Sequence, residues 1–293
     1  MMPRTTDILL TGIAPAIWGS TYIVTTEFLP QGYPLTAAML RALPAGLLLL
    51  IIVRRLPEPA LWARILVLGA LNFSVFWSLL FLAAYRLPGG VAATLGALQP
   101  LMVIFLARAA LNRPILPVSV IAAVAGVGGV SLLVLTSKAA LEPWGMVAAL
   151  AGALSMAAGT VLSRKWQPPV SALTFTAWQL TAGGALLLPV AFWAEPALPK
   201  LSTENLLGFV YLGAIGAALT YVLWFRGVRN LEPAALSTLG FLSPVSAVLL
   251  GWIFLDQNLS VLQLIGFGVV LASIWLSQRP HVPFWKGPPL PAR

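Results

Sequence analysis

Long apolar runs recur along the whole chain and restrict the folds that it can adopt. Each run holds about 20 residues, the length that an α-helix needs to cross the hydrocarbon core of a bilayer. Only helices and closed barrels satisfy every backbone polar group inside that core. The runs therefore predict an all-α polytopic membrane protein with ten spans, over residues 8–28, 35–53, 65–85, 91–111, 117–135, 144–163, 170–193, 205–225, 233–255 and 260–278.

Composition agrees with a membrane protein and excludes several kinds of chemistry. Hydrophobic residues make up 59% of the chain and charged residues only 9%, which is unlike a soluble domain. Cysteine is absent and His281 is the one histidine. The sequence therefore lacks the residues for thiolate metal sites, cysteine nucleophiles or an intramembrane serine–histidine pair. The sequence predicts no catalytic residue, no metal and no cofactor, and a protein that is not an enzyme. An intramembrane enzyme or a purely structural or receptor protein is a weaker alternative.

The positive charge lies mainly in alternate short loops. Of the 17 Lys and Arg residues, 13 fall in the termini and in the loops expected on the same side as the termini. Loops rich in Lys and Arg stay on the cytoplasmic side. Both termini are therefore predicted to be cytoplasmic, in a multi-pass protein of the bacterial inner membrane. The net charge of +9 then needs no nucleic acid to explain it.

One short motif occurs twice, in the middle of two spans. Residues 93–100 read Ala-Thr-Leu-Gly-Ala-Leu-Gln-Pro and residues 237–244 read Ser-Thr-Leu-Gly-Phe-Leu-Ser-Pro, with five of eight positions identical at an offset of 144. A proline cannot donate to the carbonyl four residues before it, so Pro100 and Pro244 free the carbonyls of Gly96 and Gly240. Matched breaks in two halves indicate the binding site of a transporter. Ordinary proline kinks are the alternative.

The likeness between the halves extends beyond this motif. Leu68-Gly69-Ala70 recurs as Leu212-Gly213-Ala214 at the same offset, and an offset of 138 places Arg41 on Gln179 and Gly46 on Gly184. Five spans per half is an odd number, so the second half must enter the membrane from the opposite side. We expect a first five-helix repeat over 1–137, a second, inverted repeat over 138–278, and an irregular proline-rich cytoplasmic tail over 279–293.

These features together resemble a known family. Two five-span halves, the Gly-x-Leu-x-Pro element in spans four and nine, and Trp18-Gly19 in an apolar first span are similar to EamA-type members of the drug/metabolite transporter superfamily. Within it the chain looks most similar to YddG-like bacterial amino-acid exporters. The resemblance implies a central cavity lined by spans one to four and six to nine, with spans five and ten supporting from outside.

The chain offers no carboxylate at mid-membrane depth. All eight Asp and Glu residues fall at span ends or in loops, and Ile17-Trp18-Gly19-Ser20-Thr21 in span one holds no titratable group. Ion-coupled carriers usually relay protons through an intramembrane acid. We therefore expect transport by alternating access that follows the solute gradient or exchange, without a buried proton-coupling carboxylate.

Arg41 is the one formal charge well inside a span, and its role stays open at this point. It could attract a substrate carboxylate, or it could bind a carbonyl or extend toward the interface. One arginine is thin support for a phosphorylated substrate.

Uncharged polar and aromatic residues are therefore the main candidates for binding. Backbone carbonyls at the kinks would take an ammonium group and the amides a carboxylate. The predicted partners are small molecules and the lipid bilayer, with no nucleic acid, and the predicted function is export of neutral and aromatic amino acids. A multidrug, metabolite or lipid-sugar translocator is the alternative. The candidate binding residues are Trp18, Tyr22, Asn72, Trp77, Gln99, Trp178, Gln179, Thr220, Tyr221 and Ser243, with helix breaks at Gly96, Pro100, Gly240 and Pro244.

Overall fold

The structure is a computed structural model that describes residues 4–87, 89–134, 142–254 and 259–279. All regular secondary structure in these ranges is helical, and ten stretches are long and apolar enough to span a membrane, which confirms the predicted fold class. The orientation of the termini stays a prediction, and the predicted tail lies outside the described residues beyond Arg279. The spans are Arg4–Phe28, Pro34–Val53, Pro59–Ala83, Val91–Leu111, Pro117–Val134, Pro143–Lys165, Ala172–Ala194, Thr203–Asn230, Pro233–Phe254 and Val261–Gln278.

Half of these spans are continuous helices and half are interrupted. The continuous ones are α3 (Pro34–Val53), α8 (Pro117–Val134), α9 (Pro143–Lys165), α10 (Ala172–Ala194) and α15 (Val261–Gln278). In the first half, span one consists of α1 (Arg4–Trp18) and α2 (Ser20–Phe28), span three of η1 (Pro59–Leu61), α4 (Trp62–Gly69), η2 (Ala70–Ser74) and α5 (Val75–Arg86), and span four of α6 (Gly89–Gly96) and α7 (Gln99–Leu111). In the second half, span eight consists of α11 (Thr203–Gly213), η3 (Ala214–Leu219) and α12 (Thr220–Asn230), and span nine of α13 (Pro233–Thr238), η4 (Leu239–Phe241) and α14 (Leu242–Phe254).

Helix starts follow the local sequence. Proline occupies the first turn of α3, α9 and α13, where its missing N–H costs nothing and its fixed φ suits a helix. Serine caps three other helices: Ser171 accepts a hydrogen bond from the N–H of Thr174, and Ser202 and Ser260 form capping boxes. These signals set where the helices begin.

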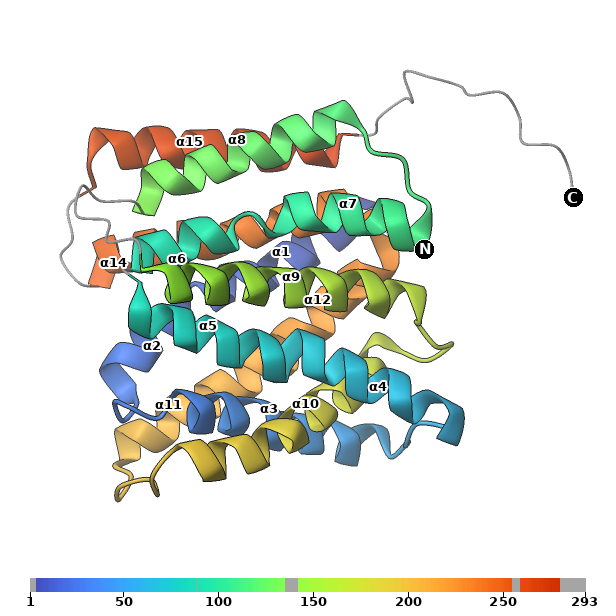
Figure 1. Ribbon diagram of the computed structural model, residues 1–293, viewed down its shortest axis with the longest axis vertical. Coiled ribbons are helices and arrows are strands. Elements are labelled where there is room, and N and C mark those ends of the chain that lie inside the picture. Colours follow the sequence, from blue (N-terminus) through green and yellow to red (C-terminus); the bar gives the residue numbers. More distant parts are fainter. Residues whose placement is uncertain (1–3, 88, 135–141, 255–258, 280–293) are drawn as a thin grey trace, which may run out of the picture.

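The spans form two edge pairs around a central group. α3 packs along α10 at one edge, and α8 packs along α15 at the other, at the top of Figure 1. The second pair lies outside the central spans, as the family resemblance implied for spans five and ten. Each edge pair joins equivalent spans of the two repeats.

The central spans divide into two bundles. The first bundle contains spans three, four and six, in which α5, α6 and α7 all pack against α9. The second contains spans eight, nine and one, in which α1 packs against α12 and α14, and α2 against α11 and α14. Since span one is the repeat counterpart of span six, the two bundles are equivalent halves of one symmetric arrangement.

Close contacts between glycines and the opposite helix show this symmetry at residue level. A Cβ added to Gly46 in α3 would lie 2.4 Å from the backbone nitrogen of Thr181, and one added to Gly184 in α10 would lie 2.6 Å from the Cα of Leu43. Gly184 is the repeat counterpart of Gly46, and Thr181 is that of Leu43. The same contact is therefore made twice, once from each side, and it lets the two backbones meet.

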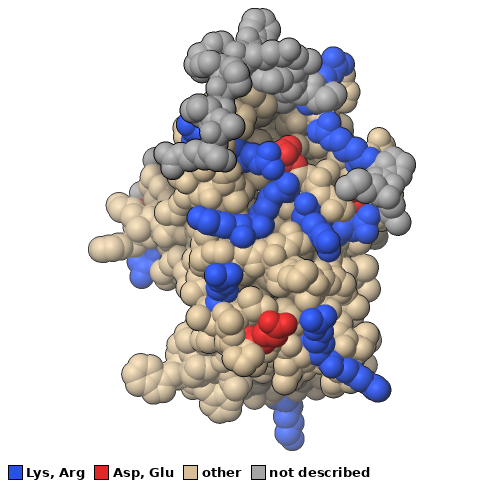
Figure 2. Space-filling model, turned by 90° about the vertical axis from the view of Figure 1, so that its right-hand side faces the viewer, with Lys and Arg blue, Asp and Glu red and all other residues tan. Residues whose placement is uncertain are grey.

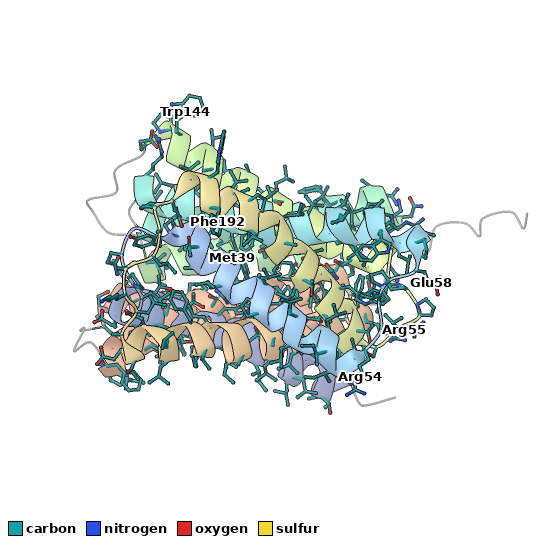
Figure 3. The ribbon with its side chains drawn as sticks, turned by 90° about the horizontal axis from the view of Figure 1, so that it is seen from below. Met39, Arg54, Arg55, Glu58, Trp144 and Phe192 are labelled. Carbon is teal, nitrogen blue, oxygen red and sulfur yellow. The ribbon has the colours of Figure 1, made fainter. Side chains whose placement is uncertain are left out.

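Two faces of the molecule differ in charge, and the surface between them is apolar. We call the face at which α1 begins and α15 ends the terminal face; Figure 2 shows that Lys and Arg gather there and that Asp and Glu are few. In Figure 3, Arg54, Arg55 and Glu58 lie at this end and Trp144 lies at the other. Large apolar side chains such as Ile51 (68% exposed) and Phe192 (83% exposed) lie on the surface between, as expected where lipid covers the protein.

Candidate functional site

The two bundles are joined at the terminal face and separate toward the opposite face. On the terminal side α7 packs against α13, and α9 against α12. In the opposite half of the described residues, α2, α11 and α14 share no comparable contact with α5 or α6. The two bundles are therefore in closer contact at the terminal face than in the opposite half, which we call the open half.

Arg164 provides the strongest polar contact across the closed end. Its Nη1 donates to the carbonyl of Val228 at 2.8 Å and to the carbonyl of Leu231, so that α9 in the first bundle holds the end of α12 in the second. Arg113 and Glu232 add an exposed ion pair at 3.7 Å across the same junction. Exposed pairs contribute little, whereas charged donors on half-buried carbonyls contribute more.

Removing the Arg164 contact is expected to open the terminal face more often. A hydrogen bond from a charged group contributes about 1.5–3 kcal/mol, so Arg164→Gln should raise the open population on the order of 10-fold. The chain has no cysteine, so Gly96→Cys alone supplies a reporter. We expect membrane-impermeant maleimide added at the terminal face to label this cysteine faster when Arg164→Gln is also present. With Arg108→Gln in its place, the labelling rate should equal that of Gly96→Cys alone. Equal labelling rates in all three proteins would contradict the role of Arg164.

Both motif copies interrupt their helices, in different ways. In span four the helix stops at Ala97 and Leu98, and within the described backbone the Ala97 carbonyl accepts no hydrogen bond while that of Leu98 accepts two, from Leu101 and Met102. In span nine one 3₁₀ turn, η4, replaces α-helix. A Cβ added to Gly96 or Gly240 would have no atom within 4 Å, so both motif glycines border open space.

Arg41 lies in α3 beside this region and contacts both bundles. Its guanidinium carbon sits 4.9 Å from the ring centroid of Trp77, on span three, and its Nη2 donates to the carbonyl of Gly216, on span eight, at 2.7 Å. Thr220 donates to the same carbonyl at 2.8 Å and accepts from Trp18 Nε1 at 2.9 Å. The side chain of Arg41 is half-buried, about two turns from the open end of α3.

The Gly216 carbonyl is available because span eight is π-helical there. The segments η2 and η3 are both π-helical, and their first residues, Ala70 and Ala214, occupy equivalent positions of the two repeats. A π-bulge removes a carbonyl from the regular ladder, and such bulges are common at functional sites. In η2 a side chain also binds a backbone carbonyl, since Ser155 Oγ donates to the Leu71 carbonyl at 2.8 Å.

A layer of aromatic rings closes the space toward the terminal face. The Tyr221 ring lies 4.6 Å from that of Phe73 and 5.0 Å from that of Trp18, centroid to centroid. Trp18 also meets Trp224 at 5.2 Å. Phe73 belongs to the first bundle and the other three to the second, so the layer joins the bundles at mid-depth.

The predicted amides Asn72 and Gln179 bind each other in the core. Asn72 Nδ2 donates to Gln179 Oε1 at 2.8 Å and to Ser163 Oγ at 3.1 Å, and both amides are fully buried. Since Gln179 is the counterpart of Arg41 and Asn72 that of Gly216, this is the same inter-repeat contact in the other half. One half is neutral and closed, and the other carries a half-exposed cation. This difference makes the Arg41 side the candidate binding site.

The structure places the remaining predicted residues in three settings. Gln99 is half-buried as the first residue of α7, directly after the break. Ser243 is half-buried in α14, and its carbonyl would lie 2.6 Å from a Cβ on Gly19, so it packs against span one. Trp178 lies apart from this group: it is buried near the terminal face and donates to the Arg55 carbonyl at 2.6 Å. The side chain of Tyr22 lies outside the described residues.

One buried ion pair was not predicted from the sequence. Asp7, in the first turn of α1, is only 7% exposed and accepts from Arg226 Nη2 at 2.7 Å and Nε at 2.9 Å. The pair joins α1 to α12 within the second bundle. Thr11 lies one turn after Asp7, is fully buried, and donates to the backbone carbonyl of Asp7. The spacing of four residues, which places both on one helix face, is the only sequence signal that this face is buried.

Comparison with known proteins gives a consistent result. The family model for the EamA-like transporter family matches residues 5–135 and again 143–278. Protein PecM of Dickeya dadantii is 48% identical over 267 residues, which cover 90% of each chain. The inner membrane transporter YedA of Escherichia coli, described as uncharacterized, is 28% identical over 267 residues, covering 89% of this chain and 86% of YedA.

Two further comparisons agree with this result. A chloroplastic WAT1-related protein of Arabidopsis thaliana is 30% identical over 283 residues, which cover 90% of this chain and 67% of that protein. One crystal structure superposes with a TM-score of 0.81 at 20% identity, over 94% of this chain and 97% of the other, which shows a shared fold alone. The predicted membership is confirmed, whereas the closer likeness to YddG-type exporters stays a prediction. The chain belongs to the EamA-like transporter family and is a multi-pass transporter of the inner membrane.

Proposed function

We propose that this transporter exports neutral amino acids, including aromatic ones, by alternating access. The observation that carries the proposal is the half-buried guanidinium of Arg41, which lies over the Trp77 ring in the open half of the molecule. A cation at membrane depth is costly unless it serves a function. A single cation beside an aromatic face suits a substrate with one carboxylate and an apolar body.

Each part of an amino acid has a suitable group near Arg41. Arginine binds carboxylates through two parallel N–H donors, and one Nη2 hydrogen of Arg41 holds the Gly216 carbonyl and fixes its orientation. The face of Trp77 would pack against an apolar or aromatic side chain. The Ala97 carbonyl at the break in span four would accept from the ammonium group. A zwitterion leaves no net charge for the membrane interior to stabilise.

The arrangement of the bundles supplies the transport cycle. Two equivalent bundles lie between two edge pairs, and they pack against each other mainly at the terminal face. Exchange of the two bundle conformations would close the open half and open the terminal face, which is the logic of inverted repeats. Arg41, on α3 between the bundles, would face the substrate in both states.

The described part of the chain offers no membrane-depth acid for proton coupling. Asp7 is its one buried carboxylate, and it lies in the first turn of α1, paired with Arg226. Proton relays use carboxylates near the middle of the membrane. We therefore expect export down the solute gradient or by exchange.

Counterflow in liposomes tests the function directly. Purified protein would be reconstituted at symmetric pH without a membrane potential, and uptake of labelled phenylalanine, methionine and threonine would be driven only by unlabelled amino acid inside. We expect uptake, and a marked reduction in Gln99→Ala, whose side chain adjoins the break. Exchange of organic cations or lipids with no exchange of any amino acid would favour the alternative of a multidrug or lipid-sugar translocator. A strict requirement for a pH gradient would contradict the uncoupled mechanism.

A further inference from the structure

A basic pocket lies at the terminal face, away from the transport site. It holds about 280 Å³ between the ends of spans two, three, six and seven, and its charged lining is Arg55, Arg64, Lys165 and Glu58. Three cations therefore surround one carboxylate. Trp166 and Leu61 add apolar surface to the pocket. Both repeats contribute to it, since Arg55 and Arg64 belong to the first and Lys165 to the second.

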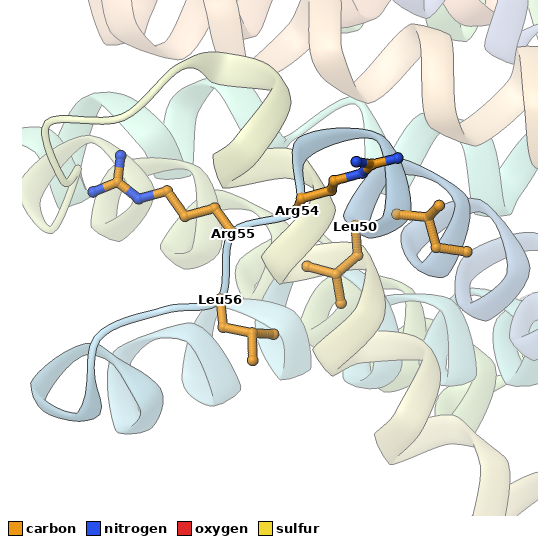
Figure 4. A pocket seen from close by; sticks show the side chains of 5 residues that line it. Leu50, Arg54, Arg55 and Leu56 are labelled. Atoms are coloured by element: carbon orange, nitrogen blue, oxygen red, sulfur yellow. The ribbon is translucent and has the colours of Figure 1, made fainter.

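An apolar groove adjoins this pocket and shares Arg55 with it. The groove holds about 340 Å³ and is lined by Leu50, Ile51 and Leu56, with Arg54 and Arg55 at its edge. Ile51 is 68% and Leu56 62% exposed, so the groove opens onto the lipid-facing surface. In Figure 4 the side chains of Arg54 and Arg55 extend to either side, with Leu50 and Leu56 between them.

The backbone around the pocket is held in place. Trp178 Nε1 donates to the Arg55 carbonyl at 2.6 Å. Arg54 ends α3 in the left-handed conformation, with φ of 47°, and its N–H bonds the Leu50 carbonyl at 2.9 Å. Arg229 donates to the Val170 carbonyl on the other side of the pocket at 3.3 Å. The Arg55 backbone is thus held in place where the basic pocket meets the apolar groove. One ligand could therefore contact both.

We propose that the pocket and groove together bind one anionic phospholipid. Its phosphate would lie between Arg55, Arg64 and Lys165, at headgroup depth, and one acyl chain would lie along Leu50, Ile51 and Leu56. Basic pockets between membrane helices on the cytoplasmic side favour anionic headgroups, and arginine binds phosphate oxygens in pairs. A soluble anion would gain nothing from the apolar groove, and a zwitterionic headgroup would bring a further cation to a pocket that already holds three. The site is independent of the proposed substrate.

Thermal unfolding of the detergent-solubilised protein tests the site. Long-chain phosphatidylglycerol, phosphatidylcholine and inorganic phosphate would be titrated separately, with tryptophan fluorescence as the readout. A ligand that binds only the native state raises the melting temperature. We expect phosphatidylglycerol to raise it clearly more than phosphatidylcholine does, and inorganic phosphate to leave it unchanged.

Matched variants separate a defined site from diffuse attraction. Arg64→Gln/Lys165→Gln removes two pocket charges, and Arg4→Gln/Arg108→Gln removes two charges from the same end of the molecule outside the pocket. We expect the pocket variant to lose more than about half of the phosphatidylglycerol shift and the control to keep it. Equal shifts in the two variants, equal shifts with the two lipids, or a full shift with inorganic phosphate would each overturn the proposal. Native mass spectrometry should show one retained phosphatidylglycerol in the wild type and the control.

Discussion

Arg41→Gln is expected to reduce phenylalanine binding by about 10- to 100-fold, because a hydrogen bond to a charged group contributes about 1.5–3 kcal/mol. The variant keeps a polar side chain at this half-buried position, so the fold should survive. Arg41→Lys retains the charge but loses the planar guanidinium, so its affinity for phenylalanine should lie between those of the wild type and Arg41→Gln. Binding isotherms and counterflow rates in the same preparations would measure both effects.

A comparison of ligands makes the Arg41 prediction specific to the carboxylate. Phenethylamine lacks the carboxylate of phenylalanine, so its weaker binding should change little between wild type and Arg41→Gln. Arg108→Gln, at the far end of α7, controls for the loss of one positive charge. If Arg41→Gln weakened both ligands equally, or neither, the guanidinium would have a structural role alone, as the Gly216 contact by itself would suggest.

Gly46→Ala is expected to cost about 1–3 kcal/mol of stability or more, because the added carbon meets backbone atoms that cannot move aside. It would lie 2.4 Å from the nitrogen of Thr181 and 2.8 Å from the carbonyl carbon of Leu180, so α3 and α10 would have to separate. This cost opposes the gain of about 0.5–1 kcal/mol that Gly→Ala brings inside a helix. Thermal unfolding in detergent, with the folded yield, would measure the balance.

Gly128→Ala is the matched control for Gly46→Ala. A Cβ on Gly128 in α8 would have no atom within 4 Å, so helix propensity alone acts there and stability should stay equal or rise. By the repeat relationship Gly184→Ala should behave like Gly46→Ala, since it meets Leu43 at 2.6 Å. Equal melting temperatures for Gly46→Ala and Gly128→Ala would show that the helix crossing tolerates separation.

The spans were predictable because the bilayer imposes their length, but their ends and interruptions were less so. The sequence predicts span one from Ile8, but α1 already includes Arg4, the first described residue, and Asp7 is buried by its pairing with Arg226, 219 residues away. Span three was expected from Ile65, yet Pro59 starts a 3₁₀ turn that leads into it. The π-helical segments leave no signal in a run that is apolar on every side, although the repeat of Leu68-Gly69-Ala70 marked their place.

The candidate site was predicted by residue type better than by arrangement. Intramembrane amides must find partners, so Asn72 and Gln179 were singled out, but only the fold shows that they bind each other. Arg41 left two roles open because its neighbours, Trp77 and Gly216, come from spans far along the chain. Trp178 is an aromatic residue within a span, as a cavity residue would be, and the sequence does not show that its indole binds the Arg55 carbonyl.

The contact made by Arg164 has a consequence for the threshold at which this carrier operates. The repeat counterpart of Arg164 is Thr26, 138 residues earlier. The Thr26 hydroxyl donates to the carbonyl oxygen of Ile23 in its own helix, at 3.2 Å, and so does not join the bundles. The opposite face therefore has no equal contact at the equivalent position, and we expect the state closed at the terminal face to be favoured. A sparsely populated binding state lowers apparent affinity by its fraction. If the termini are cytoplasmic as predicted, the proposed export would begin only after solute has accumulated inside the cell.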